Sequence, residues 1–419
     1  MSYHRRPPYL IIFVCAILLL CIGFMPSSIV CAAQVMKKNT SQVKQNALVH
    51  HSGRKQTDEG FELALPGYVY HFPEDHASHP SFKTEWWYYT GHLHTVDDDS
   101  LDVRHHFGYE LTFFRIGQSP LKKPEADIIS NDFWKSDTYY MAHFALTDET
   151  GQRFFHTQRF NRNTPFRAGA DASSYHVWNE DWKARAQSNN VHEIQASHQK
   201  GLKQGFSLNL SLNEGKGPVI HGEKGVSQKA DCHGCASHYY SLTRMPSKGV
   251  ITLGDKTYAV EGSSWMDHEF GSNQLQKNQV GWDWFSLQLS DGYELMLYQM
   301  RLREGGNDPN SSGTWVDPSG QSTHISLSQM NIEPLNTWVS PHTKGQYPSG
   351  WRIYDTQKNI DVTVTPVLSD QELVPEFAAY GVAYWEGRCK VSGFHNGTKV
   401  SGEAYVELTG YDKPFTQKL

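Results

Sequence analysis

Two aromatic-rich segments of the chain carry acidic residues that could do chemistry. Glu85 precedes four consecutive aromatic residues (86–89), and Asp267 lies between Trp265 and Phe270. A carboxyl group among apolar rings is poorly solvated, which raises its pKa and can keep it protonated near neutral pH. Such a group could act as a general acid toward an apolar molecule that comes within hydrogen-bonding reach.

Each of these acids also has a purely structural interpretation. Asp267 could pair with an arginine or cap a turn, and Glu85 could pair with Lys83 or Arg115 at the rim of a barrel. Because Asp is depleted in β-strands, its presence in an aromatic strand makes Asp267 the candidate proton donor. We predict that Glu85 and its neighbour Trp87 contribute to a substrate-binding surface.

A third aromatic segment, Ser237-His238-Tyr239-Tyr240, supplies further candidates. His238 could orient the carboxyl group of Asp267 or hold a water molecule, so we predict it as the second catalytic residue. Tyr240 and Trp265 could line the pocket around the acid. The structural alternative is that whichever of the two tyrosines faces inward is an ordinary core residue.

Alternating patterns identify the elements that must position these residues as β-strands. Residues 206–212 alternate apolar and polar side chains, with the period of two that a half-buried strand shows. In residues 282–289 one face is apolar, whereas Trp282 and Trp284 share the other face with polar residues, which fits a ligand cavity. Asp291-Gly292 is a strong hairpin signal. The expected strands cover 85–94, 105–116, 138–147, 153–160, 191–199, 206–212, 282–303, 350–365 and 381–409.

Many short antiparallel strands favour an all-β barrel or sandwich architecture. The chain lacks a Gly-x-Ser-x-Gly elbow, a phosphate-binding loop, a dinucleotide fingerprint and a His-Glu-x-x-His motif. A cofactor-free acid reaction or simple binding is therefore expected, with no cofactor and no metal. The basic residues are scattered, so nucleic acid is not an expected partner.

Three cysteines, Cys232, Cys235 and Cys389, lie beyond residue 33. Cys232 and Cys235 could form a local disulfide or remain a loop thiol pair, and a zinc site would need further ligands, for which His221 and His238 are candidates. Cys389 lies in an expected strand and should be buried.

The N-terminal residues have the features of an export signal. A basic pair, Arg5-Arg6, precedes the apolar run 10–22 and the small residues at 32–33. We expect residues 1–33 to be a signal peptide, with a retained membrane anchor as the alternative, and residues 34–60 to be a flexible linker. The protein is thus expected to be secreted or periplasmic.

Five segments of the chain resemble, in order, those of the AttH-like family of secreted lipocalin-like proteins, which is related to the carotenoid 1,2-hydratases. They are KTEWWYYTGHL (83–93), SHYYS (237–241), WMDHEFG (265–271), GWDWFS (281–286) and GEAYVELTGY (402–411). The resemblance implies two consecutive lipocalin-like antiparallel β-barrel domains, at 61–272 and 273–419.

The resemblance also implies a chemistry. In the carotenoid hydratases an Asp in a similar motif is thought to protonate an isolated double bond, and water then quenches the cation. Asp267 has that place here, and the upstream histidine and the aromatic residues correspond to His238, Tyr240 and Trp265. The predicted activity is that of a hydratase or lyase acting on a long apolar terpenoid or lipid. The alternative is a non-catalytic carrier of a hydrophobic ligand that works with an ABC-type membrane exporter.

Overall fold

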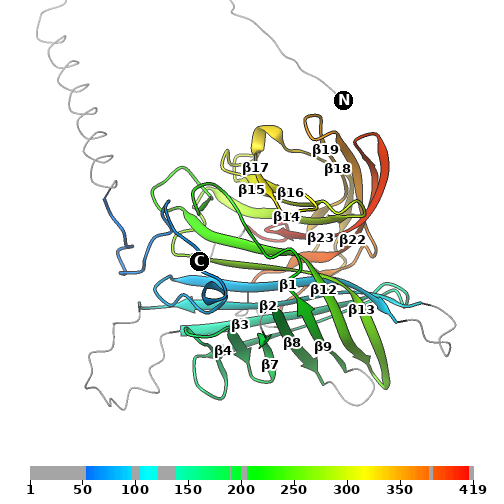
Figure 1. Ribbon diagram of the computed structural model, residues 1–419, viewed down its shortest axis with the longest axis horizontal. Helices are drawn as coiled ribbons and strands as arrows, with labels where there is room; N and C mark the ends of the chain where they lie inside the picture. Colours follow the sequence, from blue (N-terminus) through cyan, green and yellow to red (C-terminus); the bar gives the residue numbers. More distant parts are fainter. Residues whose placement is uncertain are drawn as a thin grey trace, which may run out of the picture. The chain divides into compact units, whose positions relative to one another are not determined.

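The computed structural model describes residues 53–96, 104–120, 138–188, 190–199, 205–376 and 381–414 (Figure 1). The predicted signal peptide and residues 34–52 of the predicted linker lie outside the described residues. Residues 55–419 form one compact unit. Within the described ranges, no helix has the length and apolar character needed to cross a membrane.

The first antiparallel sheet contains 13 strands, in the order β4-β3-β2-β1-β13-β12-β9-β8-β7-β6-β5, and β10 and β11 pair with β12. A 3-10 helix, η1 (Glu74–His76), precedes it. The strands are β1 (Thr84–Thr95), β2 (His106–Gly117), β3 (Thr138–Asp148), β4 (Arg153–Arg162), β5 (Ala168–Ala170), β6 (His176–Asn179), β7 (Trp182–Ser188), β8 (Val191–His198), β9 (Phe206–Asn213), β10 (Pro218–Ile220), β11 (Ser227–Gln228), β12 (Ala236–Leu253) and β13 (Lys256–Gly271).

The second antiparallel sheet contains 10 strands, in the order β17-β16-β15-β14-β23-β22-β20-β19-β18, and β21 pairs with β22. A second 3-10 helix, η3 (Leu327–Gln329), lies between two of its strands. The strands are β14 (Gln279–Leu289), β15 (Glu294–Leu302), β16 (Ser312–Val316), β17 (Ser322–Ser326), β18 (Asn331–Val339), β19 (Gln346–Asp355), β20 (Ile360–Pro366), β21 (Glu372–Leu373), β22 (Tyr384–His395) and β23 (Thr398–Thr409).

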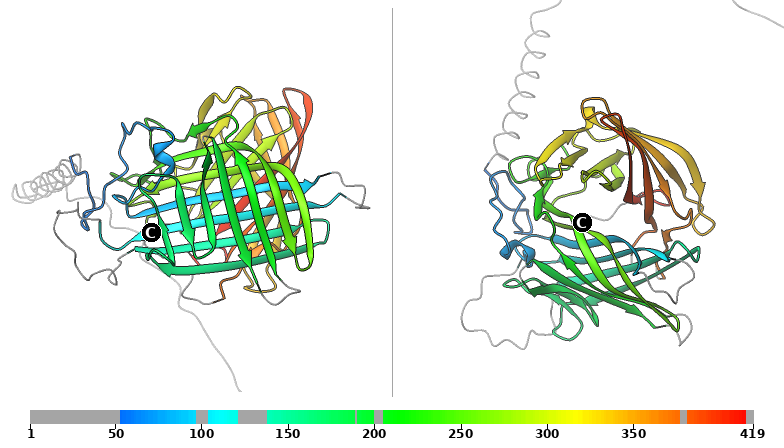
Figure 2. Two further views of the ribbon diagram at one scale, coloured as in Figure 1. Left: turned by 60° about the horizontal axis from the view of Figure 1, so that its bottom comes forward. Right: turned by 45° about the vertical axis from the view of Figure 1, so that its right-hand side comes forward.

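Each sheet curls into a barrel-like structure, and both views in Figure 2 show the second sheet, yellow to red, packed beside the first. The all-β, two-barrel prediction is confirmed. Strand alternation sends one set of side chains into each barrel, because successive residues of a strand point to opposite faces. The other set from β1, β12 and β13 meets residues of β14, β15 and β23 in a separate aromatic cluster between the sheets.

The expected strands lie where the sequence placed them, with end differences of a few residues. The hairpin at Asp291-Gly292 joins β14 to β15, and Cys389 is a buried free cysteine in β22. The first sheet ends at Gly271 and the second begins at Gln279. The predicted division into domains at 272/273 stays a prediction, since residues 55–419 are one compact unit.

Candidate active site between the two sheets

A largely aromatic cavity lies between the sheets, walled by β1, β2, β3, β12 and β13 on one side and by β14, β15, β22 and β23 on the other. Apolar rings form most of its surface, and several acidic side chains interrupt them. The aromatic residues of the wall are Trp86, Tyr88, Phe114, Tyr239, Trp282, Trp284, Tyr298 and Tyr384. Trp282 and Trp284 thus lie in a cavity wall, as their strand pattern suggested, and their role in substrate binding stays a prediction.

Asp267 reaches this cavity from β13 and is only 4% exposed. Three side chains donate hydrogen bonds to its carboxyl group. The Tyr239 hydroxyl lies 2.5 Å from Oδ2, the Trp265 indole Nε1 lies 2.6 Å from Oδ1, and Ser241 Oγ also donates to Oδ1. Burial raises the pKa of Asp267 to about 7, although these hydrogen bonds oppose the shift. A substantial fraction of Asp267 therefore holds a proton at neutral pH.

Strand register explains why these groups converge. Antiparallel pairing sets Asp267 opposite Tyr88 on β1 and opposite Ser241 on β12. Directly opposed residues project from the same face of a sheet. Tyr239, two residues before Ser241, shares that face, and so does Trp265.

Further acids line the cavity beyond Asp267. Burial raises the pKa of Glu407 to about 7, and Trp282 Nε1 donates to its carboxyl group at 3.0 Å. Glu386 accepts a hydrogen bond from the Tyr88 hydroxyl, and burial followed by repulsion from Glu110 raises its pKa well above the ordinary value. Burial and mutual repulsion thus favour the protonated forms of Glu407 and Glu386.

A buried cation also borders the cavity. Lys229 Nζ lies 2.9 Å from Glu269 and 4.2 Å from the ring centroid of Tyr298. Burial disfavours the ammonium, but attraction to Glu269 outweighs it and raises the pKa of Lys229. Lys229 is therefore charged, and it places a positive charge beside the cavity that Asp267 lines.

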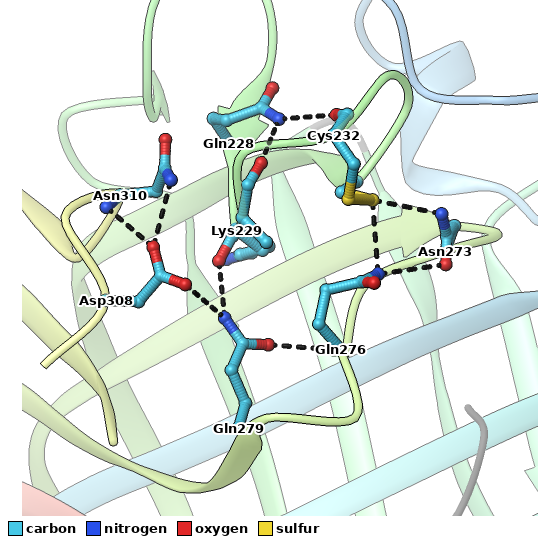
Figure 3. Close-up of a disulfide and its surroundings, with 10 residues drawn as sticks. Gln228, Lys229, Cys232, Asn273, Gln276, Gln279, Asp308 and Asn310 are labelled. Carbon is cyan, nitrogen blue, oxygen red and sulfur yellow. Dashed lines mark hydrogen bonds between the residues drawn. A yellow bond between two sulfur atoms is a disulfide. The ribbon is translucent and has the colours of Figure 1, made fainter. Parts of the chain in front are cut away.

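The loop that carries Lys229 is closed by the Cys232–Cys235 disulfide, which confirms the disulfide interpretation of that pair. Figure 3 shows the amides that surround it. Asn273 and Gln276 donate to Cys235 Sγ at 3.0 and 3.1 Å, and a third amide, that of Gln279, donates to the Lys229 carbonyl at 2.7 Å. The loop and the segment that joins the two sheets are thus held together beside the cavity.

The prediction that His238 acts on Asp267 is wrong. His238 is paired with Phe270 and projects from the opposite face of the sheet. Its ring stacks on Tyr68 at 4.2 Å between centroids, and its Nδ1 lies 2.8 Å from the carbonyl oxygen of Gly225. Burial lowers the pKa of His238 to about 4, so its ring is neutral and belongs to a packed aromatic cluster.

Tyr240 is likewise misassigned as a pocket residue. It lies opposite His268 inside the first barrel, and its hydroxyl lies 2.9 Å from His268 Nδ1 and 2.7 Å from His76 Nδ1. The side chain that contacts Asp267 is that of Tyr239. Neighbouring residues of a strand project from opposite faces, so the choice of Tyr240 in place of Tyr239 put the predicted contact on the wrong face.

Of the two residues predicted to contribute to a substrate-binding surface, Glu85 lines the cavity, whereas Trp87 does not. Arg115 Nε lies 2.9 Å from Glu85 Oε2, and His268 Nε2 lies 2.9 Å from Oε1. Burial opposes ionisation, but Arg115 and the neighbouring histidines hold the pKa of Glu85 well below its usual range. The Glu85 carboxylate is therefore already paired with Arg115, as its structural interpretation predicted. Trp87 is 1% exposed and packs in the core of the first barrel.

A different histidine lies behind Asp267. His221 Nε2 is 2.6 Å from Ser241 Oγ, and its Nδ1 is 2.7 Å from Thr314 Oγ1. Since Ser241 donates its proton to Asp267, His221 Nε2 must donate to Ser241. Ser241 and His221 thereby fix the orientation of the carboxyl group, the role that had been given to His238.

Sequence reasoning missed several residues of the site, including Lys229, Glu386, Glu407 and Ser241. Glu407 lies two residues after Tyr405 in the segment 402–411. An acidic residue in an aromatic strand is the same signal that identified Asp267, and it could have identified Glu407. Lys229 had no comparable signal. Among the described residues, two groups have spacing suited to a metal ion, His76–His192–Glu214 and His79–Glu85–His268, and neither uses Asp267.

The chain belongs to the AttH-like family, whose model matches residues 63–411. An AttH protein of Nitrosomonas europaea has a similar solved structure, at 28% identity and a TM-score of 0.71, covering 84% of this chain and 99% of that one. The structure of kievitone hydratase from Nectria haematococca is similar in fold, at 14% identity and a TM-score of 0.61, covering 86% of this chain and 97% of that one. No curated protein matches the chain.

Proposed function

We propose that this protein is an exported, cofactor-free hydratase or lyase that acts on a double bond of a long apolar terpenoid or lipid. The observation that carries the proposal is the Asp267 carboxyl group, which is buried, has a pKa of about 7 and faces an aromatic cavity. An acid of this kind is protonated often enough to donate and is near its ideal pKa for general acid catalysis at neutral pH.

The reaction balances without a co-reactant other than water. The π electrons of the double bond take the proton of Asp267, which forms a C–H bond and leaves a carbocation beside a carboxylate. A water molecule then forms a C–O bond to the cation and returns its surplus proton to the Asp267 carboxylate. The product is an alcohol, and the reverse sequence is a dehydration.

The cavity wall supplies what this cation needs. Trp282, Trp284 and Tyr88 line the cavity, and an aromatic face presented to a nearby cation can stabilise it by roughly 0.5–2 kcal/mol. Trp284 Nε1 donates to the Tyr239 hydroxyl at 3.0 Å, which orients that hydroxyl on Asp267. Tyr239 is therefore a positioning residue for the acid.

Membership of the AttH-like family and the fold shared with kievitone hydratase support this proposal. The likeness to kievitone hydratase is one of fold, at 14% identity, and does not indicate the substrate of this chain. A wall made mostly of rings selects an apolar molecule that is long enough to reach between the sheets.

The rival function is a carrier that binds a hydrophobic ligand unchanged and passes it to or from a membrane exporter. One observation favours it. Three donors converge on Asp267, and hydrogen bonds of this kind stabilise the ionised form, which cannot donate a proton. If burial outweighs these hydrogen bonds, Asp267 is protonated and can act as an acid. If the hydrogen bonds outweigh burial, Asp267 is ionised and the cavity can only bind.

The Asp267→Asn variant separates them. Asn keeps the shape and can accept from Trp265 and Ser241, but it has no acidic proton. We expect wild-type protein, incubated with squalene or unsaturated fatty acids in heavy-oxygen water, to yield a labelled alcohol, and the variant to be slower by roughly 10²–10⁴-fold. Product mass by liquid chromatography and mass spectrometry is the measurement.

The matched control is Asp283→Asn, which changes a buried aspartate bonded to Arg301 and Tyr411 outside the cavity wall. It should retain turnover if it remains folded by circular dichroism. Turnover that survives in Asp267→Asn contradicts the acid mechanism. Ligands that co-purify and are released unchanged, as seen by native mass spectrometry, favour the carrier.

A further inference from the structure

Two histidines and a glutamate converge inside the first barrel, away from the cavity. His76 in η1 and His192 in β8 are 2% and 1% exposed, and Glu214 directly follows β9, which pairs with β8 (Figure 1). His76 Nε2 lies 3.4 Å from Glu214 Oε1, and His192 Nε2 lies 3.3 Å from the same oxygen. The proposed hydration reaction uses none of the three.

These separations suit ligands of one metal ion better than hydrogen-bonded partners. A charge-assisted N–H···O bond is about 2.7–2.9 Å long. Two ligands at about 2.0–2.2 Å from a tetrahedral zinc ion are about 3.4 Å apart, from the geometry of the tetrahedron. His76 Nε2, moreover, is a buried nitrogen without a hydrogen-bond partner among the described residues.

In a neighbouring cluster, two histidines contact a glutamate at hydrogen-bond distance. His79 Nδ1 and His268 Nε2 lie 2.8 and 2.9 Å from Glu85 Oε1, and Arg115 binds the second carboxylate oxygen. Here both contacts have hydrogen-bond length, and a guanidinium neutralises the charge. The cluster of Glu214 has longer contacts, and within the described ranges Glu214 forms no ion pair with a Lys or Arg.

The Tyr240 hydroxyl joins the two clusters, because it contacts one histidine of each. The Glu85 carboxylate can only accept, so His268 donates from Nε2 and, as a neutral ring, accepts at Nδ1. The Tyr240 hydroxyl then donates to His268 Nδ1 and accepts from His76 Nδ1–H, at 2.9 and 2.7 Å. His76 Nε2 is the ring nitrogen that faces Glu214 Oε1, at 3.4 Å.

We propose that His76, His192 and Glu214 bind a divalent transition-metal ion, with zinc as the best match. Two imidazole nitrogens, one carboxylate and a water form a known zinc ligand set. Both histidines have the supporting contacts that metal ligands require, because Tyr240 holds Nδ1 of His76 and Tyr89 lies 3.1 Å from Nδ1 of His192. The site lies on the opposite face of the sheet from Asp267 and is independent of the proposed reaction.

The experiment uses the full chain without a histidine tag, under non-reducing conditions that keep Cys232 and Cys235 oxidised. Protein washed with a chelator and dialysed against zinc should retain about one equivalent per chain by mass spectrometry of the metal. His192→Gln and Glu214→Gln should abolish retention. Tyr240→Phe keeps every ligand but loses the supporting hydroxyl, so we expect a 10–100-fold weaker zinc affinity by chelator competition.

The matched control is His79→Gln, which alters the hydrogen-bonded cluster and should leave zinc stoichiometry unchanged. Near-ultraviolet circular dichroism establishes that each variant is folded, and cobalt in place of zinc should give the visible absorption of a tetrahedral site. Wild-type protein that retains neither zinc nor cobalt after dialysis overturns the proposal. Equal loss in His79→Gln and in a folded His192→Gln variant also overturns it.

Discussion

Asp267 couples the chemistry of the site to the stability of the fold. Burial raises its pKa from 3.8 to about 7, so the folded state holds this proton more tightly than the unfolded chain does. Between these two pH values the folded state binds more protons, and its free energy of unfolding therefore falls as pH rises. The stabilisation is complete below the unfolded pKa of 3.8 and is lost once the pH passes about 7.

Asp267→Asn should remove this dependence. We expect the fall of the unfolding free energy between about pH 4 and pH 7 to become less steep, by up to about 1.4 kcal/mol per pH unit. Glu407, whose pKa is also raised by burial, keeps part of the slope in the variant. Urea denaturation at several pH values measures the effect. The exposed Asp361, replaced by Asn, is the control, and equal slopes for Asp267→Asn and wild type contradict the raised pKa.

At the scale of elements, the strands could be predicted from the sequence but their pairing could not. Alternation in residues 282–289 correctly assigned Trp282 and Trp284 to the cavity. Asp267 was found because an acid in an aromatic strand is unusual. The assignment of His238 and Tyr240 failed because the face of a β12 residue depends on how that strand is aligned with β13, and local sequence does not contain that register.

Tyr239→Phe tests the register directly. The change keeps the ring but removes the hydroxyl that donates to Asp267 Oδ2. Loss of a hydrogen bond to the charged form raises the pKa of the acid further. We expect the upper midpoint of the pH–rate profile to move to higher pH. Tyr258→Phe, a change inside the barrel on β13, should leave the midpoint in place, and an unmoved midpoint in Tyr239→Phe contradicts the assignment.

The disulfide loop is a second element whose role can be measured. It closes only a short stretch of chain, Cys232 to Cys235, so the chain-entropy model gives about 2 kcal/mol of stabilisation. A Cys232→Ser/Cys235→Ser variant should lose about that much unfolding free energy in urea. Reductant should lower the stability of wild type equally and leave the variant unaffected. A loss well above this value would mean that the contacts of Cys235 with Asn273 and Gln276 matter more than loop closure.

For the whole molecule, the cavity exists only if the two sheets stay together. Buried polar contacts join them: Tyr88 donates to Glu386, and the Tyr384 hydroxyl lies 2.6 Å from His143 Nδ1. The two partners of each hydrogen bond come from different sheets. Separating the sheets would break these bonds, and any group that stayed buried would lack a partner. We therefore expect residues 55–419 to unfold in one cooperative transition, although the sequence predicted two consecutive domains.

Glu294 is the strongest test of this coupling. It is fully buried in the second sheet, and its carboxylate binds Lys216 Nζ at 2.8 Å and Arg244 Nε at 2.5 Å, both from the first-sheet region. Removing one partner of a buried pair leaves charge uncompensated and costs about 3–5 kcal/mol, with the lower end expected here because both cations are partly exposed. Glu294→Gln should thus lower the unfolding free energy by about 3 kcal/mol, whereas the exposed Glu304→Gln should change it little.

Calorimetry distinguishes a coupled molecule from two independent barrels. If the sheets unfold together, Glu294→Gln moves a single transition to lower temperature and leaves the ratio of calorimetric to van't Hoff enthalpy near one. If the sheets unfold separately, the variant splits the transition in two. The substitution removes an ion pair between the sheets and leaves the cores of the two barrels intact. A split transition would mean that the cavity can open by separation of the barrels, and ligand entry would then depend on this contact.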